Sequence, residues 1–128
     1  MTRLLIVDDD PEVRRTLVAF FEDEGFAARP AADAERALAL LDEVVFEVAV
    51  VDIRLPGIDG ATLIERMLVD HPNLRVLVHT GSIDFVLSQR LRDLGLADND
   101  ILTKPVLDMS RFVQAVRERT DNDTQEAP

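Results

Sequence analysis

Four short apolar runs in this chain each end at a polar side chain that can do chemistry. The runs end at Asp8 and Asp9, at Asp52, at Thr80 and at Lys104. Runs of this kind, rich in Val, Ile and Leu and separated by helical patterns, are typical of parallel strands in an α/β sheet. Because ligand sites in such sheets lie outside the carboxyl ends of the strands, we expect these side chains to meet at one edge. Three carboxylates, a hydroxyl and an ammonium there indicate a site for a divalent cation and a phosphoryl group.

Five strand-plus-helix units fill the chain without a long structureless gap. The strand candidates are residues 3–7, 26–32, 48–52, 75–78 and 101–103. Pro30 confines the second strand to an edge of the sheet, because proline cannot donate a hydrogen bond to a central ladder. Asp10 and Asp33 are N-cap candidates for the first two helices, and Asp108 for the last. A fourth helix would open at Ser82 or Asp84, with an apolar face of Phe85, Leu87, Leu91 and Leu94.

Length and composition fit one globular domain. We expect a folded domain over residues 1–119 and a disordered acidic tail over residues 120–128. The start of the chain has no secretory character and no segment is long enough to span a membrane, which favours the cytoplasm. The absence of cysteine excludes disulfides and thiolate metal sites. A formal net charge of −11 argues against direct binding to nucleic acid or an anionic membrane.

The acidic side chains at the strand ends favour a magnesium site. Asp8, Asp9 and Asp52 repel one another when ionised unless a cation screens them. An open site with oxygen ligands suits Mg²⁺ better than a closed Ca²⁺ cage. The alternative is that these aspartates serve only as loop and cap residues, and we assign Asp10 mainly to that role. Two adjacent uncapped acids after a buried strand favour the metal site for Asp8 and Asp9.

The polar residues after the last two strands can contact a phosphoryl group. Lys104 is the only lysine, whereas the other 13 basic residues are arginine. A compact ammonium acts as a point charge, which the planar guanidinium of arginine does not reproduce. Thr80 precedes Gly81, so its hydroxyl lies where the backbone is open to a ligand. Strand alternation points His79 elsewhere, and we interpret that residue as core or surface filling.

Together these residues resemble the receiver domain of two-component response regulators. The resemblance runs from Leu4 to about Arg119. The segment 4–10 is similar to the opening acidic pair of that family, and the segment 52–60 to its phosphoacceptor loop. Thr80-Gly81 and Thr103-Lys104-Pro105 resemble its switch hydroxyl and its lysine-proline pair. Each motif alone is weak evidence, but four in this order and spacing are specific.

The resemblance implies a flavodoxin-like, doubly wound sheet in strand order 2-1-3-4-5, with helices on both faces. It implies that Asp52 accepts a phosphoryl group from a histidine kinase phosphohistidine or a small acyl phosphate. Mg²⁺ would bind to Asp9, to Asp52 and to the backbone carbonyl of Arg54, while Asp8 would position a metal-bound water. Lys104 and Thr80 would contact the phosphoryl oxygens. The domain would then catalyse only its own phosphorylation and dephosphorylation, and would not otherwise be an enzyme.

The sequence departs from the family where the signal leaves the domain. Ile101 stands where relatives often carry an aromatic residue, and the chain has no Tyr or Trp. Ile101 can therefore only repack, and an aromatic swing coupled to Thr80 is absent. Arg54 and Ser82 hold positions that tune the phosphoryl lifetime in relatives, so we expect a modified lifetime of unspecified direction. The partners implied are a sensor histidine kinase or phosphotransfer protein and a further downstream protein, with a monomer and a phosphorylation-dependent homodimer both left open.

Three other classes of function compete with this interpretation. A non-phosphorylated pseudo-receiver, acting as an interaction module, predicts the loss of site residues, and none of the main ones is lost. A magnesium-dependent phosphatase with an aspartyl nucleophile requires a second acid two residues later, where Arg54 stands. A flavin carrier of the same fold requires a phosphate-binding loop after the first strand, where Asp8 and Asp9 would repel phosphate.

Overall fold

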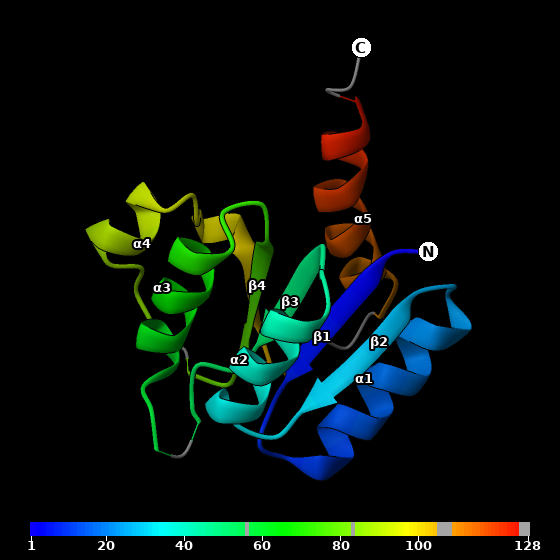
Figure 1. Ribbon diagram of the computed structural model, residues 1–128, viewed down its shortest axis with the longest axis horizontal. Helices are drawn as coiled ribbons and strands as arrows, with labels where there is room; N and C mark the ends of the chain where they lie inside the picture. The colour runs from blue at the N-terminus through cyan, green and yellow to red at the C-terminus, as the bar shows by residue number, and fades with distance from the viewer. Residues whose placement is uncertain (56, 83, 105–108, 126–128) are drawn as a thin grey trace.

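The fold is built on one parallel sheet whose strands run in the order β2-β1-β3-β4-β5 (Figure 1). It is taken from a computed structural model that describes residues 1–55, 57–82, 84–104 and 109–125, with side chains through Thr120. The strands are β1 (Arg3–Val7), β2 (Ala27–Ala31), β3 (Val48–Val51), β4 (Arg75–Thr80) and β5 (Ile101–Thr103). The helices are α1 (Pro11–Asp23), α2 (Ala34–Glu43), α3 (Gly60–Asp70), α4 (Gln89–Asp93), the 3-10 helix η1 (Asp98–Asp100) and α5 (Met109–Gln125). This arrangement confirms the predicted doubly wound α/β class.

Helices cover both faces of the sheet, as Figure 1 shows, with α1 and α5 on one face and α2, α3 and α4 on the other. The alternation of β1 explains why both faces need a cover. Leu5 and Val7 pack into the core under α2 and α3, whereas Leu4 and Ile6 pack under α1 and α5. All four side chains are almost fully buried. A strand buried on both faces appears in the sequence as a continuous apolar run, which is the pattern that predicted the sheet.

The N-termini of α1 and α2, the helices that follow β1 and β2, are fixed by the predicted caps. The side chain of Asp10 accepts hydrogen bonds from the backbone N–H groups of Glu12 and Val13, and that of Asp33 accepts one from Arg36. The strand between these helices, β2, lies at the edge of the sheet and contains Pro30, as predicted. The predicted cap Asp108 lies outside the described residues.

The fourth helix differs from the prediction, because it begins at Gln89 and not at Ser82 or Asp84. Ser88 is its N-cap and accepts a hydrogen bond from the backbone N–H of Leu91 at 3.2 Å. Before that cap, Phe85 is partly buried, Val86 is 77% exposed and Leu87 is 4% exposed. This alternation of inward and outward side chains belongs to extended backbone. The apolar residues reach the core without a helix, so nothing requires an earlier helix start.

The last helix also differs, because α5 continues to Gln125 past the predicted boundary at residue 119. Phe112, Val113 and Val116 form its buried face, as predicted. A helix that is already formed gains one hydrogen bond for each residue added, so a polar segment can extend it without burying apolar surface. The backbone of residues 120–125 is helical, and the predicted disorder of the acidic tail over residues 120–128 stays a prediction.

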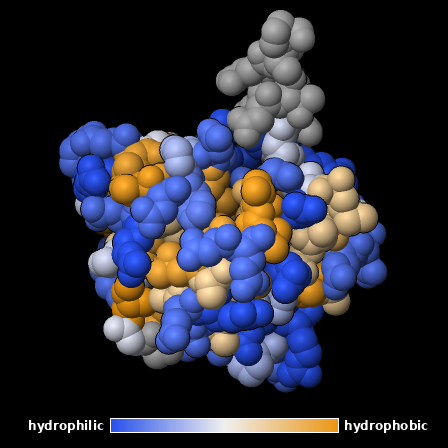
Figure 2. Space-filling view, viewed as in Figure 1, coloured by the Kyte–Doolittle hydropathy of each residue, from blue (hydrophilic) through white to orange (hydrophobic). Residues whose placement is uncertain are grey.

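The surface agrees with the charged composition. The face drawn in Figure 2 is mostly hydrophilic, with separate apolar patches between the charged side chains. Within the described residues, no helix combines the length and the apolar character that a membrane crossing requires.

Candidate functional site

The carboxyl edge of the sheet brings together the polar residues that the sequence placed at strand ends. Asp8 directly follows β1, Asp52 follows β3, Thr80 ends β4 and Lys104 follows β5. Asp8, Asp52 and Thr80 are 2%, 6% and 0% exposed, so each must be paired or hydrogen-bonded to be stable there. Asp9 is exposed beside them. The strands β1, β3, β4 and β5 lie next to one another in this order, with β2 outside them at the edge. The topology alone therefore accounts for the convergence of the four residues.

Lys104 joins the two buried carboxylates. Its Nζ lies 2.8 Å from Oδ2 of Asp8 and 3.0 Å from Oδ2 of Asp52. Burial by itself would lower the pKa of Lys104, but the hydrogen bonds and the charges of both aspartates outweigh it and raise the pKa above its usual value. The ammonium is therefore held in its charged form. The ammonium also contacts the residues that follow two different strands, β1 and β3, and this fixes the direction of the Lys104 side chain.

Both buried aspartates use their second oxygen in the same way. Oδ1 of Asp8 accepts a hydrogen bond from the backbone N–H of Asp10 at 2.9 Å. Oδ1 of Asp52 accepts one from the backbone N–H of Arg54 at 3.0 Å. Each carboxylate is thus held by an amide two residues later and by the ammonium of Lys104. This geometry fixes the plane of each carboxylate and keeps its remaining lone pairs at the edge of the sheet.

The three aspartates fit a small divalent cation. One carboxylate oxygen from each of Asp8, Asp9 and Asp52 lies within 4.8 Å of the others. Two oxygens on opposite sides of one Mg²⁺ are separated by roughly 4.2 Å. Three carboxylate oxygens gathered within a span of this size are close enough to be shared by one ion. The donor set is composed of oxygen alone, which is the chemistry that Mg²⁺ prefers.

Thr80 lies fully buried at the end of β4. Its Oγ1 accepts a hydrogen bond from the backbone N–H of Ser82 at 3.1 Å, and its carbonyl oxygen accepts one from the N–H of Lys104 at 2.7 Å. Because Oγ1 is the acceptor in the first bond, the hydroxyl hydrogen can still be donated. The second bond ties the end of β4 to the start of the segment that carries the lysine.

His79 fills the core behind the site, as the sequence suggested. Its ring packs edge-on against Phe112, with 5.1 Å between ring centroids, and its Nδ1 has no hydrogen-bond partner among the described residues. Burial, with a smaller contribution from the charge of Lys104, lowers the pKa of His79 to about 4. The imidazole is therefore neutral and does not belong to the set of charged groups at the edge.

Two positions that support the site were missed by the sequence analysis. Nη1 of Arg14 donates a hydrogen bond to the carbonyl oxygen of Asp8 at 2.7 Å. Gly60 lies so close to the segment after β3 that an added Cβ would be 2.3 Å from the carbonyl oxygen of Ile53. An arginine one turn inside a helix that follows an acidic pair could have suggested the first contact. No sequence signal distinguishes Gly60 from an ordinary turn glycine.

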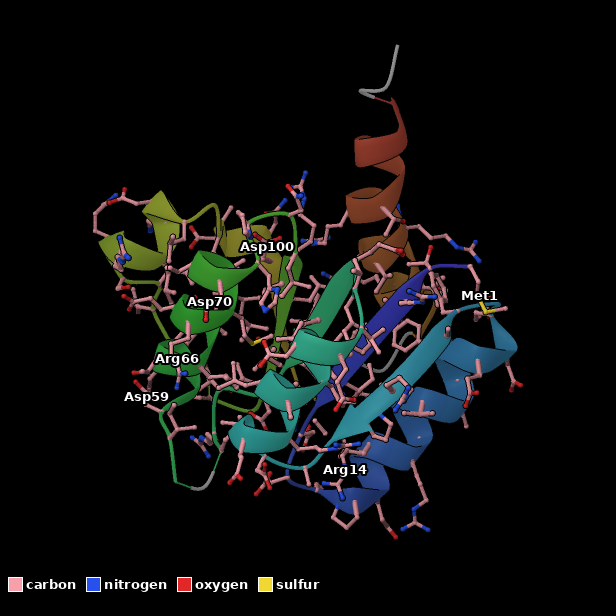
Figure 3. All side chains as sticks on the ribbon, viewed as in Figure 1. Met1, Arg14, Asp59, Arg66, Asp70 and Asp100 are labelled. Atoms are coloured by element: carbon pink, nitrogen blue, oxygen red, sulfur yellow. The ribbon has the colours of Figure 1, made fainter. Side chains whose placement is uncertain are left out.

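Figure 3 shows where some of these residues lie. Arg14 and Asp59 are at the carboxyl end of the strands, and Asp100 is at the opposite end. Asp59 caps α3 by accepting a hydrogen bond from the backbone N–H of Ala61 at 3.2 Å, and this fixes the end of the loop that begins at Asp52. The proposed metal ligand in that loop, the carbonyl of Arg54, stays a prediction.

Known proteins with similar sequences and similar folds fall into one family. The family described as the response regulator receiver domain matches residues 4–117. The transcriptional regulatory protein AruR of Pseudomonas aeruginosa is 36% identical over 109 residues, which cover 81% of this chain and 43% of AruR. The chain spans less than half the length of the first curated relatives that it matches.

Solved structures give the same result for the fold. A CheY-like response regulator receiver domain protein from Methanospirillum hungatei is 27% identical, with a TM-score of 0.83 and 99% of each chain covered. The response regulator TrrA of Thermotoga maritima, solved in complex with Mg²⁺-BeF, is 21% identical, with a TM-score of 0.80 over 93% of this chain and 99% of TrrA. At that identity, the second likeness bears on the fold alone.

Proposed function

This chain belongs to the response regulator receiver domain family, and on that premise we propose that it is switched by transfer of a phosphoryl group to Asp52. The observation that carries the proposal is the placement of Lys104, whose ammonium lies 3.0 Å from Asp52 and 2.8 Å from Asp8. A lone ammonium between two carboxylates, at an edge that also holds a third, combines a nucleophile with the positive charge needed to accept an anion.

The transfer is a displacement at phosphorus. A carboxylate oxygen of Asp52 attacks the phosphorus atom of a phosphohistidine, or of a small acyl phosphate. A new P–O bond forms while the bond from phosphorus to the donor breaks, and the electron pair of that bond leaves with the donor. Lys104 and the hydroxyl of Thr80 then face the new phosphoryl oxygens as an ion pair and a hydrogen bond. The N–H of Arg54, which already contacts Oδ1, keeps the carboxylate in its plane during the attack.

The acidic residues hold the cation in this proposal. Asp9, Asp52 and the backbone carbonyl of Arg54 would bind Mg²⁺, and Asp8 would contact it through water; the proposal is supported by the clustering of one oxygen from each of the three carboxylates within 4.8 Å. When bound, the ion offsets the negative charge that gathers as a phosphoryl group approaches an aspartate. Asp8 has a second role toward Lys104, whose ammonium it holds at the same edge.

Receiver domains interact with histidine kinases or phosphotransfer proteins, and we propose such a protein as the phosphoryl donor here. The phosphorylated state would act through contacts with a further protein, with no direct contact to nucleic acid or membrane. In the structure Ile101 is partly buried and packs against the core under α3 and α4. A change at Thr80 would therefore reach the surface by repacking Ile101, because the chain has no Tyr or Trp to swing there.

The test is phosphorylation by acetyl phosphate, followed by intact mass. We expect one phosphate adduct that requires both Mg²⁺ and Asp52, so that wild type gains it and Asp52→Asn does not. Asp100→Asn is the matched control, because it removes one carboxylate at the other end of the sheet. An Asp52→Asn protein that still gains the adduct would place the phosphoacceptor elsewhere. No adduct on wild type, while a known receiver is modified in parallel, would support the pseudo-receiver.

A further inference from the structure

The backbone of the turn formed by Asp8, Asp9 and Asp10 is held by a side chain to which the sequence analysis gave no role. Arg14, one turn into α1, is partly buried and its Nη1 donates to the carbonyl oxygen of Asp8 at 2.7 Å. The neighbouring Arg15 is exposed, and its side chain makes no hydrogen bond or ion pair within the part of the chain that the structure describes. Two adjacent arginines on one helix therefore differ in burial and in the contact with this carbonyl.

The contact completes the restraint of Asp8. Its N–H donates to the carbonyl of Ala31 at 3.2 Å, its Oδ1 accepts from Asp10 and its Oδ2 accepts from Lys104. The carbonyl oxygen is the remaining polar group of the residue, and it is bonded to Arg14. Since that carbonyl belongs to the peptide unit joining Asp8 to Asp9, the bond fixes the orientation of the unit.

Asp9 depends on this peptide unit for its direction. Its carboxylate is exposed and makes no hydrogen bond or ion pair with another described residue, yet one of its oxygens lies within 4.8 Å of those of Asp8 and Asp52. The backbone thus sets where Asp9 lies, and the bond from Arg14 sets the backbone. A free peptide unit would let the Asp9 carboxylate point to water in many directions.

We propose that Arg14 is a positioning residue that orients the Asp8–Asp9 peptide so that Asp9 can bind the cation. The inference rests on the magnesium site of the proposed function. The expected effect of removing Arg14 on Mg²⁺ binding is opposite in sign to that of simple electrostatics. A positive charge beside three carboxylates repels a cation, so removing the charge alone should tighten Mg²⁺ binding. Removing an outer-shell hydrogen bond that orients a ligand instead weakens metal binding, commonly by tenfold or more.

The experiment compares Arg14→Met and Arg15→Met with wild type by calorimetric titration with Mg²⁺ alone. Methionine keeps an apolar stem of similar length and removes the charge at both positions. We expect the dissociation constant of Arg14→Met to rise about tenfold. Arg15→Met should bind Mg²⁺ as tightly as wild type or slightly more tightly. Arg14→Lys, which retains the charge and a donor, should fall between wild type and Arg14→Met and also serves if Arg14→Met does not fold.

A second readout needs no metal. The amide of Asp9 belongs to the peptide unit that Arg14 contacts, so its ¹⁵N chemical shift should change in Arg14→Met and Arg14→Lys but not in Arg15→Met. If Arg14→Met binds Mg²⁺ as tightly as Arg15→Met, Arg14 contributes charge alone and the inference is wrong. If wild type itself does not bind Mg²⁺, the metal site of the proposed function fails and the inference fails with it. The acetyl phosphate experiment on Asp52 is separate and identifies which of the two has failed.

Discussion

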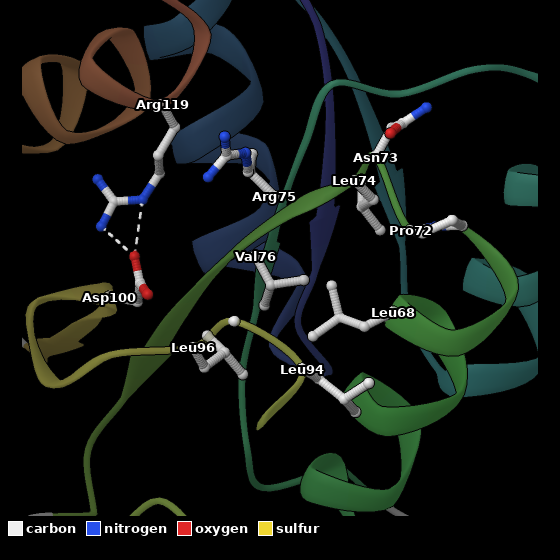
Figure 4. A pocket seen from close by; sticks show the side chains of 11 residues that line it. Leu68, Pro72, Asn73, Leu74, Arg75, Val76, Leu94, Leu96, Asp100 and Arg119 are labelled. Atoms are coloured by element: carbon white, nitrogen blue, oxygen red, sulfur yellow. Dashed lines mark hydrogen bonds and ion pairs between the residues drawn. The ribbon is translucent and has the colours of Figure 1, made fainter. Parts of the chain in front are cut away.

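The two edges of the sheet each hold a basic side chain against carboxylates, but only the cluster at the carboxyl edge has more carboxylates than cations. At the carboxyl edge, the ammonium of Lys104 faces Asp8 and Asp52, with a third carboxylate nearby. At the amino edge, the guanidinium of Arg119 faces Asp100 (Figure 4). The first cluster carries excess negative charge and can accept a cation, whereas the charges of Arg119 and Asp100 balance each other.

The amino edge is also saturated with hydrogen bonds. Arg119 is 9% exposed and donates from Nε to Oδ1 of Asp100 at 3.0 Å. Its Nη1 donates to the carbonyl of Ala115 at 2.5 Å, and its Nη2 to that of Asn99 at 3.1 Å and also to Asp100. These bonds tie α5 to η1. A cavity of about 490 Å³ lies beside them, lined in part by Leu68, Val76, Leu94 and Leu96 (Figure 4).

The comparison shows that buried charge alone does not indicate function. A cation whose donors are satisfied and whose charge is matched stabilises the fold, because its contacts leave nothing for a ligand to complete. A cation shared by several carboxylates leaves net negative charge, which a bound metal ion can neutralise. We therefore expect substitutions at the amino edge to change stability, and substitutions at the carboxyl edge to change binding.

The largest effect is predicted at the amino edge. Arg119→Met should lower the free energy of unfolding by about 3 kcal/mol, because it leaves Asp100 and two carbonyls without their buried donor. Urea unfolding followed by circular dichroism measures this, since the chain has no Trp or Tyr to report by fluorescence. Phosphorylation of the folded variant should match wild type. The control is Arg117→Met, which removes a half-exposed guanidinium 3.9 Å from Glu24 and should cost less than about 1 kcal/mol. Equal losses in the two variants would contradict the assignment.

The next largest effect is predicted from Mg²⁺ at the carboxyl edge. An ion that binds the native state alone should raise the free energy of unfolding by about 2 kcal/mol at 30 times its dissociation constant. Asp9→Asn should remove most of this gain, because it removes the exposed carboxylate of the cluster. Arg119→Met should retain the whole gain, although it starts from a lower stability. A gain that survives in Asp9→Asn would place the ion elsewhere.

The sequence predicted the carboxyl edge far better than the amino edge, for a physical reason. Asp8, Asp52 and Lys104 end apolar strands, and parallel strands end at the same edge, so local patterns were enough to bring them together. The pair of Arg119 and Asp100 joins two residues on different elements, with no period or motif that links them. The same reason applies to the Arg14 contact, which depends on how closely a side chain approaches a backbone carbonyl.

Competition between alternative N-caps explains the error in the predicted start of the fourth helix. The fourth helix was placed too early because Phe85 and Leu87 were assigned to one helical face with Leu91 and Leu94, yet Phe85 and Leu87 reach the core from extended backbone. Ser88 then supplies the cap that the pattern alone could not rank above Ser82 or Asp84.

A smaller effect is predicted from His79, which lies behind the carboxyl edge. Burial lowers its folded-state pKa to about 4, below the value of 6.5 that applies to an unfolded chain. Between these values the unfolded state binds a proton that the native state does not, so stability falls as the pH falls from about 6.5 toward 4. We expect a loss of order 1 kcal/mol between pH 7 and 5 that His79→Gln lacks. His71→Gln, at the other histidine of the chain, should keep the wild-type dependence. The same slope in both variants would mean that carboxylates cause it.

The smallest effect is predicted from Lys104 at alkaline pH, and the composition of the chain isolates it. With one lysine and no Tyr or Cys, Lys104 is the one side chain with an ordinary pKa between about 8.5 and 12. Asp8 and Asp52 outweigh burial and raise its folded-state pKa, so the native state keeps a proton that the unfolded state loses first. Stability should be constant from pH 9 to about 10, then fall by at most about 1.4 kcal/mol per pH unit, because a single proton is involved.

Urea unfolding at several pH values should show this fall in wild type and not in Lys104→Met. Arg119→Met should retain the fall, since the amino edge has no group that titrates in this range. A fall that persists in Lys104→Met would mean that the proton is lost elsewhere, and the contrast between the two edges would then not rest on this lysine.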